Sequence, residues 1–207
     1  MKKISLGGVG GCELALAIRM FDQHSFPYDW LITSQSFILQ SFNDFSKFFE
    51  FNEEYVYDQS KLLEKNKKAI MLHDFNDFSL QKDNVMEKYL RRFDRLNSAL
   101  TDANDASILF IRINDNLEEI LSPPLYYDHI FNREEEDLEI WNEFMKNISK
   151  KYKKTCTLLF ISSHHQHNKS HSNNNQTLDH VIVRYTTHHK IPEKLYEIIA
   201  NVERDLV

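Results

Sequence analysis

Apolar residues along the chain follow two patterns, short continuous runs and longer stretches with an apolar residue every three or four positions. Continuous runs are typical of buried strands and occupy residues 2–6, 69–72, 107–113, 155–162 and 180–185. Helical spacing covers residues 13–20, 34–50, 83–100, 134–152 and 192–205. This alternation predicts an α/β fold of three layers, a largely parallel sheet flanked by helices.

The segments between these elements refine the prediction. Asp83 is a plausible N-cap for the long central helix, and Pro192 suits the first turn of the last helix. Residues 25–33 form a loop with an aromatic anchor, while residues 51–66 are mixed and polar and predict no element. We therefore expect residues 1–207 to form a single domain.

A tract rich in His, Asn and Ser spans residues 163–177 and is predicted to be a solvated, low-complexity loop. The alternative is a metal site, because the tract holds four closely spaced histidines, His164, His165, His167 and His171. The chain has no His-Glu-x-x-His helix and no paired cysteine ligands. We therefore expect no metal and no other cofactor, although one of these histidines could approach a site at the same sheet edge.

The charge and cysteine content exclude several classes of protein. The net charge of −6 argues against nonspecific binding to nucleic acid or to an anionic membrane. No apolar run approaches the ~20 residues of a membrane span. With two cysteines, no disulfide framework organises the fold, and a reducing compartment is expected. The chain enters a strand directly, without a signal-peptide pattern, so we expect a cytoplasmic protein.

All four glycines lie in the window 7–11, directly before Cys12. The window separates a predicted strand from a predicted helix, so Cys12 is expected at or near a helix N-terminus, where unpaired N–H groups and the helix dipole favour a thiolate. Three interpretations remain open. The window is a tight turn with a buried cysteine, a phosphate or dinucleotide loop, or a nucleophile beside an oxyanion-binding backbone. Glu13 stands where the dinucleotide motif has its third glycine, which disfavours the second interpretation.

His73 lies where a predicted strand ends, which is where sites gather in α/β sheets. A cysteine nucleophile needs a base, and the base needs an orienting partner. Asp29 and Asp74 are the candidates for that partner. Neighbouring side chains on an extended chain point to opposite faces, which gives Asp29 a small advantage over Asp74.

Arginines mark two further positions. Arg112 stands inside an otherwise apolar strand, and a buried guanidinium needs a partner. We expect either a pairing with an acid such as Asp29 or Asp74, or a place among the ligand-binding groups of the site. Arg91, Arg92 and Arg95 share one helix face, which is either solvated or turned inward to hold a carboxylate.

Several short blocks occur in an order that resembles a known family. They are Ser-Leu-Gly at 5–7 followed by Cys12, Pro-Tyr-Asp-Trp at 27–30, His-Asp at 73–74, Lys-Tyr-x-Arg-Arg at 88–92 and Leu-Phe-Ile-Arg at 109–112. Together, over about residues 3–115, they resemble a family of papain-like cysteine peptidases found in bacteria and large DNA viruses. The resemblance implies Cys12 as nucleophile and His73 as base. The glycine stretch is two residues longer than the family spacing, and Tyr28 replaces a Phe.

The sequence thus predicts a cysteine hydrolase, either a papain-like peptidase or a related acyl-transfer enzyme. Cys12 attacks a carbonyl, His73 moves the proton, and backbone N–H groups around Gly8, Gly10 and Gly11 hold the oxyanion. The expected partner is a peptide or another acyl substrate, with no nucleic acid and no membrane. The alternative is a non-catalytic α/β module that binds a small anionic ligand at the glycine loop.

Overall fold

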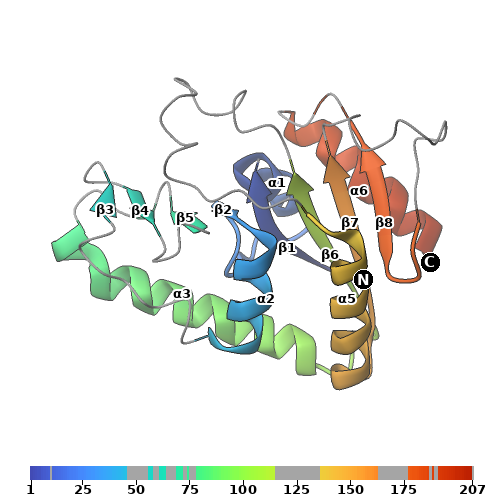
Figure 1. The fold of residues 1–207 in the computed structure, drawn as a ribbon, viewed down its shortest axis with the longest axis horizontal. Coiled ribbons are helices and arrows are strands. Elements are labelled where there is room, and N and C mark those ends of the chain that lie inside the picture. The colour runs from blue at the N-terminus through green and yellow to red at the C-terminus, as the bar shows by residue number, and fades with distance from the viewer. Residues whose placement is uncertain are drawn as a thin grey trace.

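A parallel four-stranded sheet forms the centre of the computed structural model (Figure 1). The strands are β1 (Lys2–Val9), β6 (Ser107–Asn114), β7 (Thr155–Ser162) and β8 (Val181–Tyr185), and they lie in the order β1-β6-β7-β8. Every neighbouring pair is parallel. The structure describes residues 1–9, 11–45, 56–57, 61–63, 69–71, 74, 78–114, 136–162, 177–186, 188 and 191–206.

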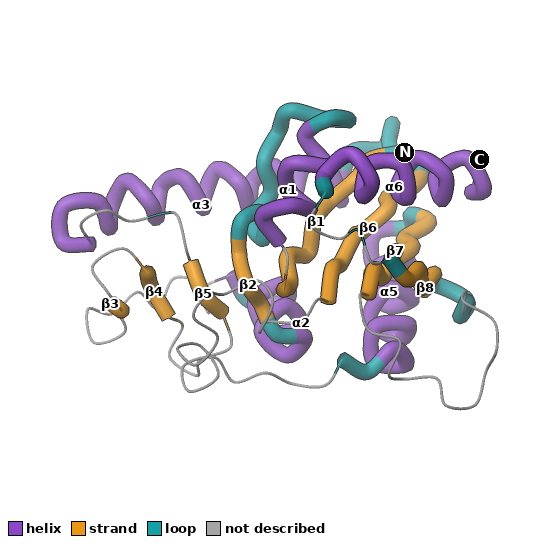
Figure 2. Tube along the Cα trace, turned by 90° about the horizontal axis from the view of Figure 1, so that it is seen from above, coloured by secondary structure: helices purple, strands orange, loops and turns teal. Residues whose placement is uncertain are grey.

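Helices cover both faces of this sheet (Figure 2). On one face lie α1 (Gly11–Arg19) and α6 (Pro192–Leu206), packed on one set of alternating strand residues such as Leu109, Ile111 and Ile113. The opposite face packs against α2 (Gln35–Asn43), α3 (Phe78–Thr101) and α5 (Leu138–Tyr152). The predicted three-layer α/β fold with a largely parallel sheet is therefore confirmed.

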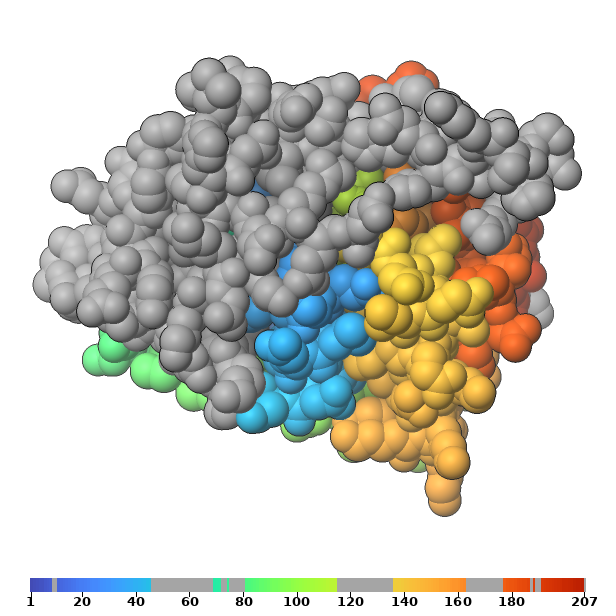
Figure 3. Space-filling model, in the orientation of Figure 1, coloured from blue at the N-terminus to red at the C-terminus, as the bar shows by residue number. Residues whose placement is uncertain are grey.

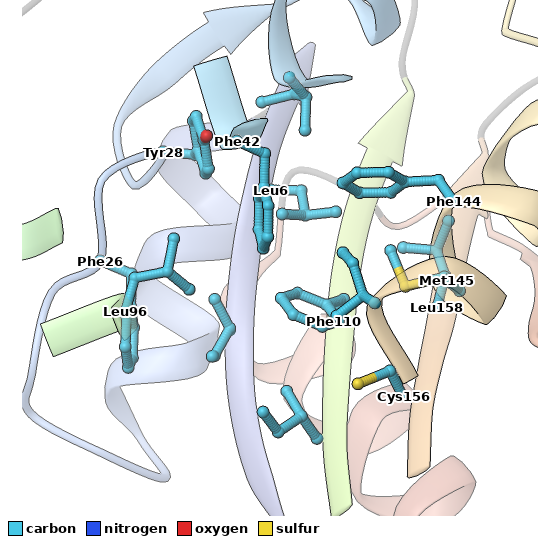
Figure 4. Packing of buried hydrophobic residues seen from close by; sticks show 14 of the residues in the cluster. Leu6, Phe26, Tyr28, Phe42, Leu96, Phe110, Phe144, Met145, Cys156 and Leu158 are labelled. Atoms are coloured by element: carbon cyan, nitrogen blue, oxygen red, sulfur yellow. The ribbon is translucent and has the colours of Figure 1, made fainter. Parts of the chain in front are cut away.

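The larger core lies between the sheet and α2, α3 and α5 (Figure 4). The Phe42 ring packs edge-on against Phe110 of β6 and Phe144 of α5, with ring centroids 6.0 and 5.2 Å apart. Cys156 of β7 is fully buried in the same core. The surfaces of α2 and α5 adjoin on this face of the molecule (Figure 3), where the Gln35 amide binds the backbone at Asp137.

A second, antiparallel sheet has the order β2-β5-β4-β3 and was not expected from the sequence. Its strands are β2 (Leu31–Thr33), β5 (Ala69–Met71), β4 (Lys61–Leu63) and β3 (Val56–Tyr57). Only β5 lies in a predicted strand. The other three hold two or three residues each, which is too short to show an alternating pattern. β2 runs beside β1 and links the two sheets (Figure 2).

Two predicted boundaries are wrong. α3 begins at Phe78, so Asp83 lies inside the helix and does not cap it. β1 continues to Val9, so Gly7 and Gly8 belong to the strand. The register of β1 against β6 shifts between Ser5 and Gly8, as it does when a strand gains one residue in a bulge. Gly7 and Gly8 have φ of 66° and 117°, values that glycine adopts most readily.

No helix in the described residues is long and apolar enough to span a membrane.

Candidate active site

Cys12 lies in the first turn of α1, beyond the carboxyl end of β1, as predicted from the position of the glycine window. Its side chain is half-buried. The backbones of β2 and β6 lie close to the glycine window of residues 7–11, one at Gly11 and the other at Gly8. A Cβ on Gly11 would lie 2.5 Å from the Leu31 carbonyl oxygen of β2, and one on Gly8 would lie 2.0 Å from the Ile113 carbonyl oxygen of β6. Glycine at these positions is therefore required by backbone packing.

The Cys12 thiol is protonated at neutral pH. Burial raises its pKa to about 11, and the carboxylates of Glu13 and Asp74 act in the same direction. The expectation that the helix N-terminus favours the thiolate is wrong for this environment, because desolvation and two nearby negative charges oppose ionisation. A nucleophile with such a pKa needs a base to remove its proton.

Asp74 follows β5, the strand that pairs with β2 in the second sheet. β5 pairs antiparallel with β2 so that Met71 lies opposite Leu31, the residue whose carbonyl touches Gly11. Three residues later, the Asp74 carboxylate is close enough to Cys12 to raise the pKa of the thiol. The pairing of two short strands thus brings residues 62 positions apart to the same edge of the parallel sheet.

Two neighbouring residues of α3 hold the Asp74 carboxylate. The Lys88 ammonium pairs with Oδ1, and the Tyr89 hydroxyl donates a 2.6 Å hydrogen bond to Oδ2. Tyr89 is fully buried, and burial together with the Asp74 charge raises its pKa well above the ordinary value. The tyrosine therefore stays protonated and remains a donor over the physiological pH range.

His73 and Gly10 lie outside the described residues, as do the tract histidines at 164, 165, 167 and 171. The proximity of Cys12 to His73, the contribution of Gly10 to an oxyanion site and the loop assignment of residues 163–176 remain predictions. Thr177, the last residue of the tract, forms an isolated antiparallel bridge with Ile182. Of the other histidines, His180 donates from Nδ1 to the Cys156 carbonyl oxygen at 3.1 Å and so helps to join the residue before β8 to β7. Within the described part of the chain, no cluster of His, Cys, Asp or Glu could hold a metal ion.

Asp29 is buried in a different electrostatic environment. Its Oδ2 accepts the Phe26 amide at 2.8 Å, while its Oδ1 has no hydrogen-bond partner among the described residues. Burial raises its pKa from 3.8 to about 6, although Arg92, Arg19 and Arg95 favour the charged form. Arg92 is buried and favours the charged form of Asp29, which agrees with an arginine turned inward, but its Nη1 has no hydrogen-bond partner among the described residues.

Arg112 is buried and paired with an acid, as the first of the two alternatives predicted, but the acid is Glu136 and neither Asp29 nor Asp74. Its Nε lies 3.1 and 3.2 Å from the two Glu136 oxygens. Its Nη1 donates to the Leu6 carbonyl at 3.0 Å and to Thr33 Oγ1 at 2.6 Å, and its Nη2 donates to the Thr33 carbonyl at 2.6 Å. The guanidinium thus joins β1, β2 and β6 to the start of α5 directly below the glycine window.

The sequence predicts no site role for Lys88, Tyr89, Glu136 or Thr33. Tyr89 falls within the helical apolar spacing of residues 83–100, which by itself predicts a core position. A polar group on a buried face needs a partner, and that rule was the available signal. Glu136 gave no such signal, because it precedes a helix in a strongly acidic stretch.

The comparison with known families adds to this geometry. A family model described as putative papain-like cysteine peptidase matches residues 1–166. The chain belongs to this family. The match includes both cysteines, the His-Asp pair and Arg112, and extends past the region of the sequence motifs to the end of β7. No curated protein and no solved structure matches the chain.

Membership in the papain-like family supports a peptidase at a coarse level and a peptide as the class of substrate.

Proposed function

We propose that this family member is a cysteine peptidase or related acyl-transfer enzyme, with Cys12 as the nucleophile and His73 as its base. The observation that carries the proposal is the strand pairing that sets Met71 of β5 opposite Leu31, whose carbonyl oxygen packs against Gly11 next to Cys12. The Asp74 carboxylate, three residues after Met71, is close enough to act on the thiol. His73 directly precedes Asp74, and consecutive Cα atoms are about 3.8 Å apart. A base at position 73 is therefore compatible with a contact to the thiol.

The protonated state of Cys12 supports the need for such a base. With a pKa of about 11, only about one thiol in ten thousand is ionised at pH 7. Reaction through the spontaneous thiolate would be slow. A histidine that accepts the proton as the sulfur attacks removes this limit, and the carboxylate of Asp74 stabilises the imidazolium that forms.

The proposed steps balance in atoms and charge. His73 takes the Cys12 proton while Sγ bonds to the substrate carbonyl carbon, and the carbonyl oxygen becomes an oxyanion held by backbone N–H groups from the glycine window and the first turn of α1. The tetrahedral intermediate then collapses. The leaving group takes the proton from His73, and Cys12 remains acylated until water, or another acceptor, releases the acyl group.

Of the two acids proposed to orient the base, Asp74 has the stronger support, because it acts on Cys12 whereas Asp29 is bonded to the Phe26 amide beside three arginines. The alternative function, a small-anion module, has less support. Glu13 and Asp74 place negative charge at the start of α1, where an anion would bind, and Gly8 and Gly11 already have a packing role.

A labelling experiment tests the proposal without knowledge of the substrate. We expect His73→Ala to slow alkylation of Cys12 by iodoacetamide at pH 7 about tenfold or more, because the thiol loses its base. His180→Ala is the matched control, since His180 binds a β7 carbonyl and has no proposed role in the chemistry. Peptide mass spectrometry locates the label. Equal Cys12 rates in the wild type and in His73→Ala would exclude His73 as the base.

A further inference from the structure

The structure also suggests how α3 controls the site. We infer that Tyr89 and Lys88 are positioning residues that fix the Asp74 carboxylate beside Cys12. The inference rests on the proposed function, since it concerns the reactivity of the same thiol. Neither residue is proposed to touch the substrate.

The geometry of the contacts supports this role. Lys88 and Tyr89 are consecutive residues of α3, and each binds a different oxygen of Asp74. One donor would leave the carboxylate able to rotate about its own axis. Two donors on separate oxygens fix both its position and its orientation, as bidentate contacts do.

The packing of Tyr89 makes it the more rigid of the two anchors. Its ring is fully buried in the core cluster, and the Arg92 guanidinium carbon lies 4.9 Å from the ring centroid. Lys88, by contrast, has a side chain that is 34% exposed. α3 itself is a helix of 24 residues packed on the sheet. The position of Asp74 is thus determined by a rigid helix.

A fixed distance matters because the Asp74 charge has two opposite effects. The carboxylate raises the pKa of Cys12 and so disfavours an isolated thiolate. The same charge stabilises a protonated base next to the thiol. Both energies vary inversely with distance, so a carboxylate that moved away would weaken both. Reactivity at neutral pH would then change in a direction set by whichever effect is larger.

Two tyrosine variants test the inference. Tyr89→Phe removes the hydrogen bond to Asp74 and keeps the ring. Tyr28→Phe is the matched control, because Tyr28 is equally buried in the same core and its hydroxyl contacts Ser41 at 3.1 Å. In the chain of residues 1–207, we expect Tyr89→Phe to change the Cys12 alkylation rate at pH 7 by about threefold or more and to move the midpoint of its pH profile, while Tyr28→Phe leaves both unchanged.

Lys88 provides a second route that does not depend on core packing. We expect Lys88→Met to change the Cys12 pH profile in the same direction as Tyr89→Phe, and Lys88→Arg to restore the wild-type profile because it keeps a cation near Oδ1. Thermal unfolding of each variant shows whether the fold is intact. An unchanged profile in both Tyr89→Phe and Lys88→Met, or equal changes in Tyr89→Phe and Tyr28→Phe, would overturn the inference.

The sign of the change separates this inference from the proposed function. If His73 is the base, freeing Asp74 destabilises the imidazolium and slows alkylation. If Cys12 reacts as a lone thiol, freeing Asp74 removes a repulsive charge and speeds alkylation. A faster rate in Tyr89→Phe therefore supports the positioning role and contradicts the Cys12–His73 pair, whereas a slower rate supports both.

Discussion

At the residue scale, the carboxylates near the site differ in how their charges are satisfied. Asp74 has a donor on each oxygen, whereas Asp29 is buried with one oxygen lacking a partner among the described residues. An unsatisfied buried carboxylate is destabilising in its charged form. Asp29 therefore links the stability of the fold to pH, and Asp74 links α3 to the thiol.

Asp29 predicts a pH-dependent stability. Its folded pKa of about 6 exceeds the ordinary value of 3.8, so the folded state binds more protons between these values. The stability that this residue contributes is present below about pH 4 and is lost as the pH rises through about 6. We expect Asp29→Asn to raise the free energy of unfolding at pH 7 by about 1–3 kcal/mol. The same substitution should make the free energy of unfolding less dependent on pH between pH 4 and pH 6.

Urea unfolding at several pH values measures this effect. Asp94→Asn on the exposed face of α3 is the control, and we expect it to leave the pH dependence unchanged. If Asp29→Asn is less stable than the wild type at pH 7, the attraction between the Asp29 carboxylate and the three arginines outweighs the cost of burying its charge.

At the element scale, the Arg112–Glu136 pair connects four parts of the fold at the carboxyl edge of the sheet. Arg112 extends from β6 to the backbone of β1, to β2 and to Glu136, which lies two residues before α5. Trp141 of α5 donates to Glu136 Oε2 at 2.6 Å. The bulge that carries Gly8 lies directly beside Arg112, since a Cβ there would lie 3.3 Å from Nη1. The path of the chain into Cys12 depends on this pair.

Removing one partner of the Arg112–Glu136 pair should lower the free energy of unfolding more than replacing both partners with apolar residues. We expect Glu136→Gln to lower the free energy of unfolding by about 3–5 kcal/mol, because it leaves a buried guanidinium without its counter-charge. Arg112→Met with Glu136→Leu should recover part of this loss, since no buried charge remains. Chemical denaturation measures both. The exposed pair Lys194–Glu197 provides a control, Glu197→Gln, which we expect to change stability by less than about 1 kcal/mol. A loss no larger in Glu136→Gln than in Glu197→Gln would contradict this interpretation.

At the scale of the whole molecule, the two cysteines report on different processes. Cys12 is half-buried at the sheet edge, whereas Cys156 is fully buried between β7 and α5, and no disulfide joins them. Cys156 becomes accessible to a reagent only when the helical layer separates from the sheet. Labelling of Cys12 therefore follows the chemistry of the site, and labelling of Cys156 follows unfolding.

In the native protein, we expect iodoacetamide to label Cys12 at least about tenfold faster than Cys156, because a buried core thiol reacts only on opening. In concentrated urea, the two rates should converge. Quantitative mass spectrometry of the two peptides measures both rates. Faster native labelling of Cys156 would show that Cys12 is not the reactive thiol.

The sequence alone determined the parts of this protein that depend on local pattern. Continuous apolar runs identified β6 and β7, because strands buried on both faces have no polar alternation. The clustered glycines placed Cys12 at the start of α1. The ordered motifs indicated the family that the model match then confirmed.

Only the tertiary structure decided the contacts between distant segments. The short strands β2, β3 and β4 form through pairing partners, and two or three residues carry no periodic signal. The thiol's raised pKa, the partner of Arg112 and the Tyr89–Asp74 bond all depend on residues that lie 15 to 62 positions apart in the chain. Burial and charge proximity are properties of the folded packing, and a local pattern cannot specify them.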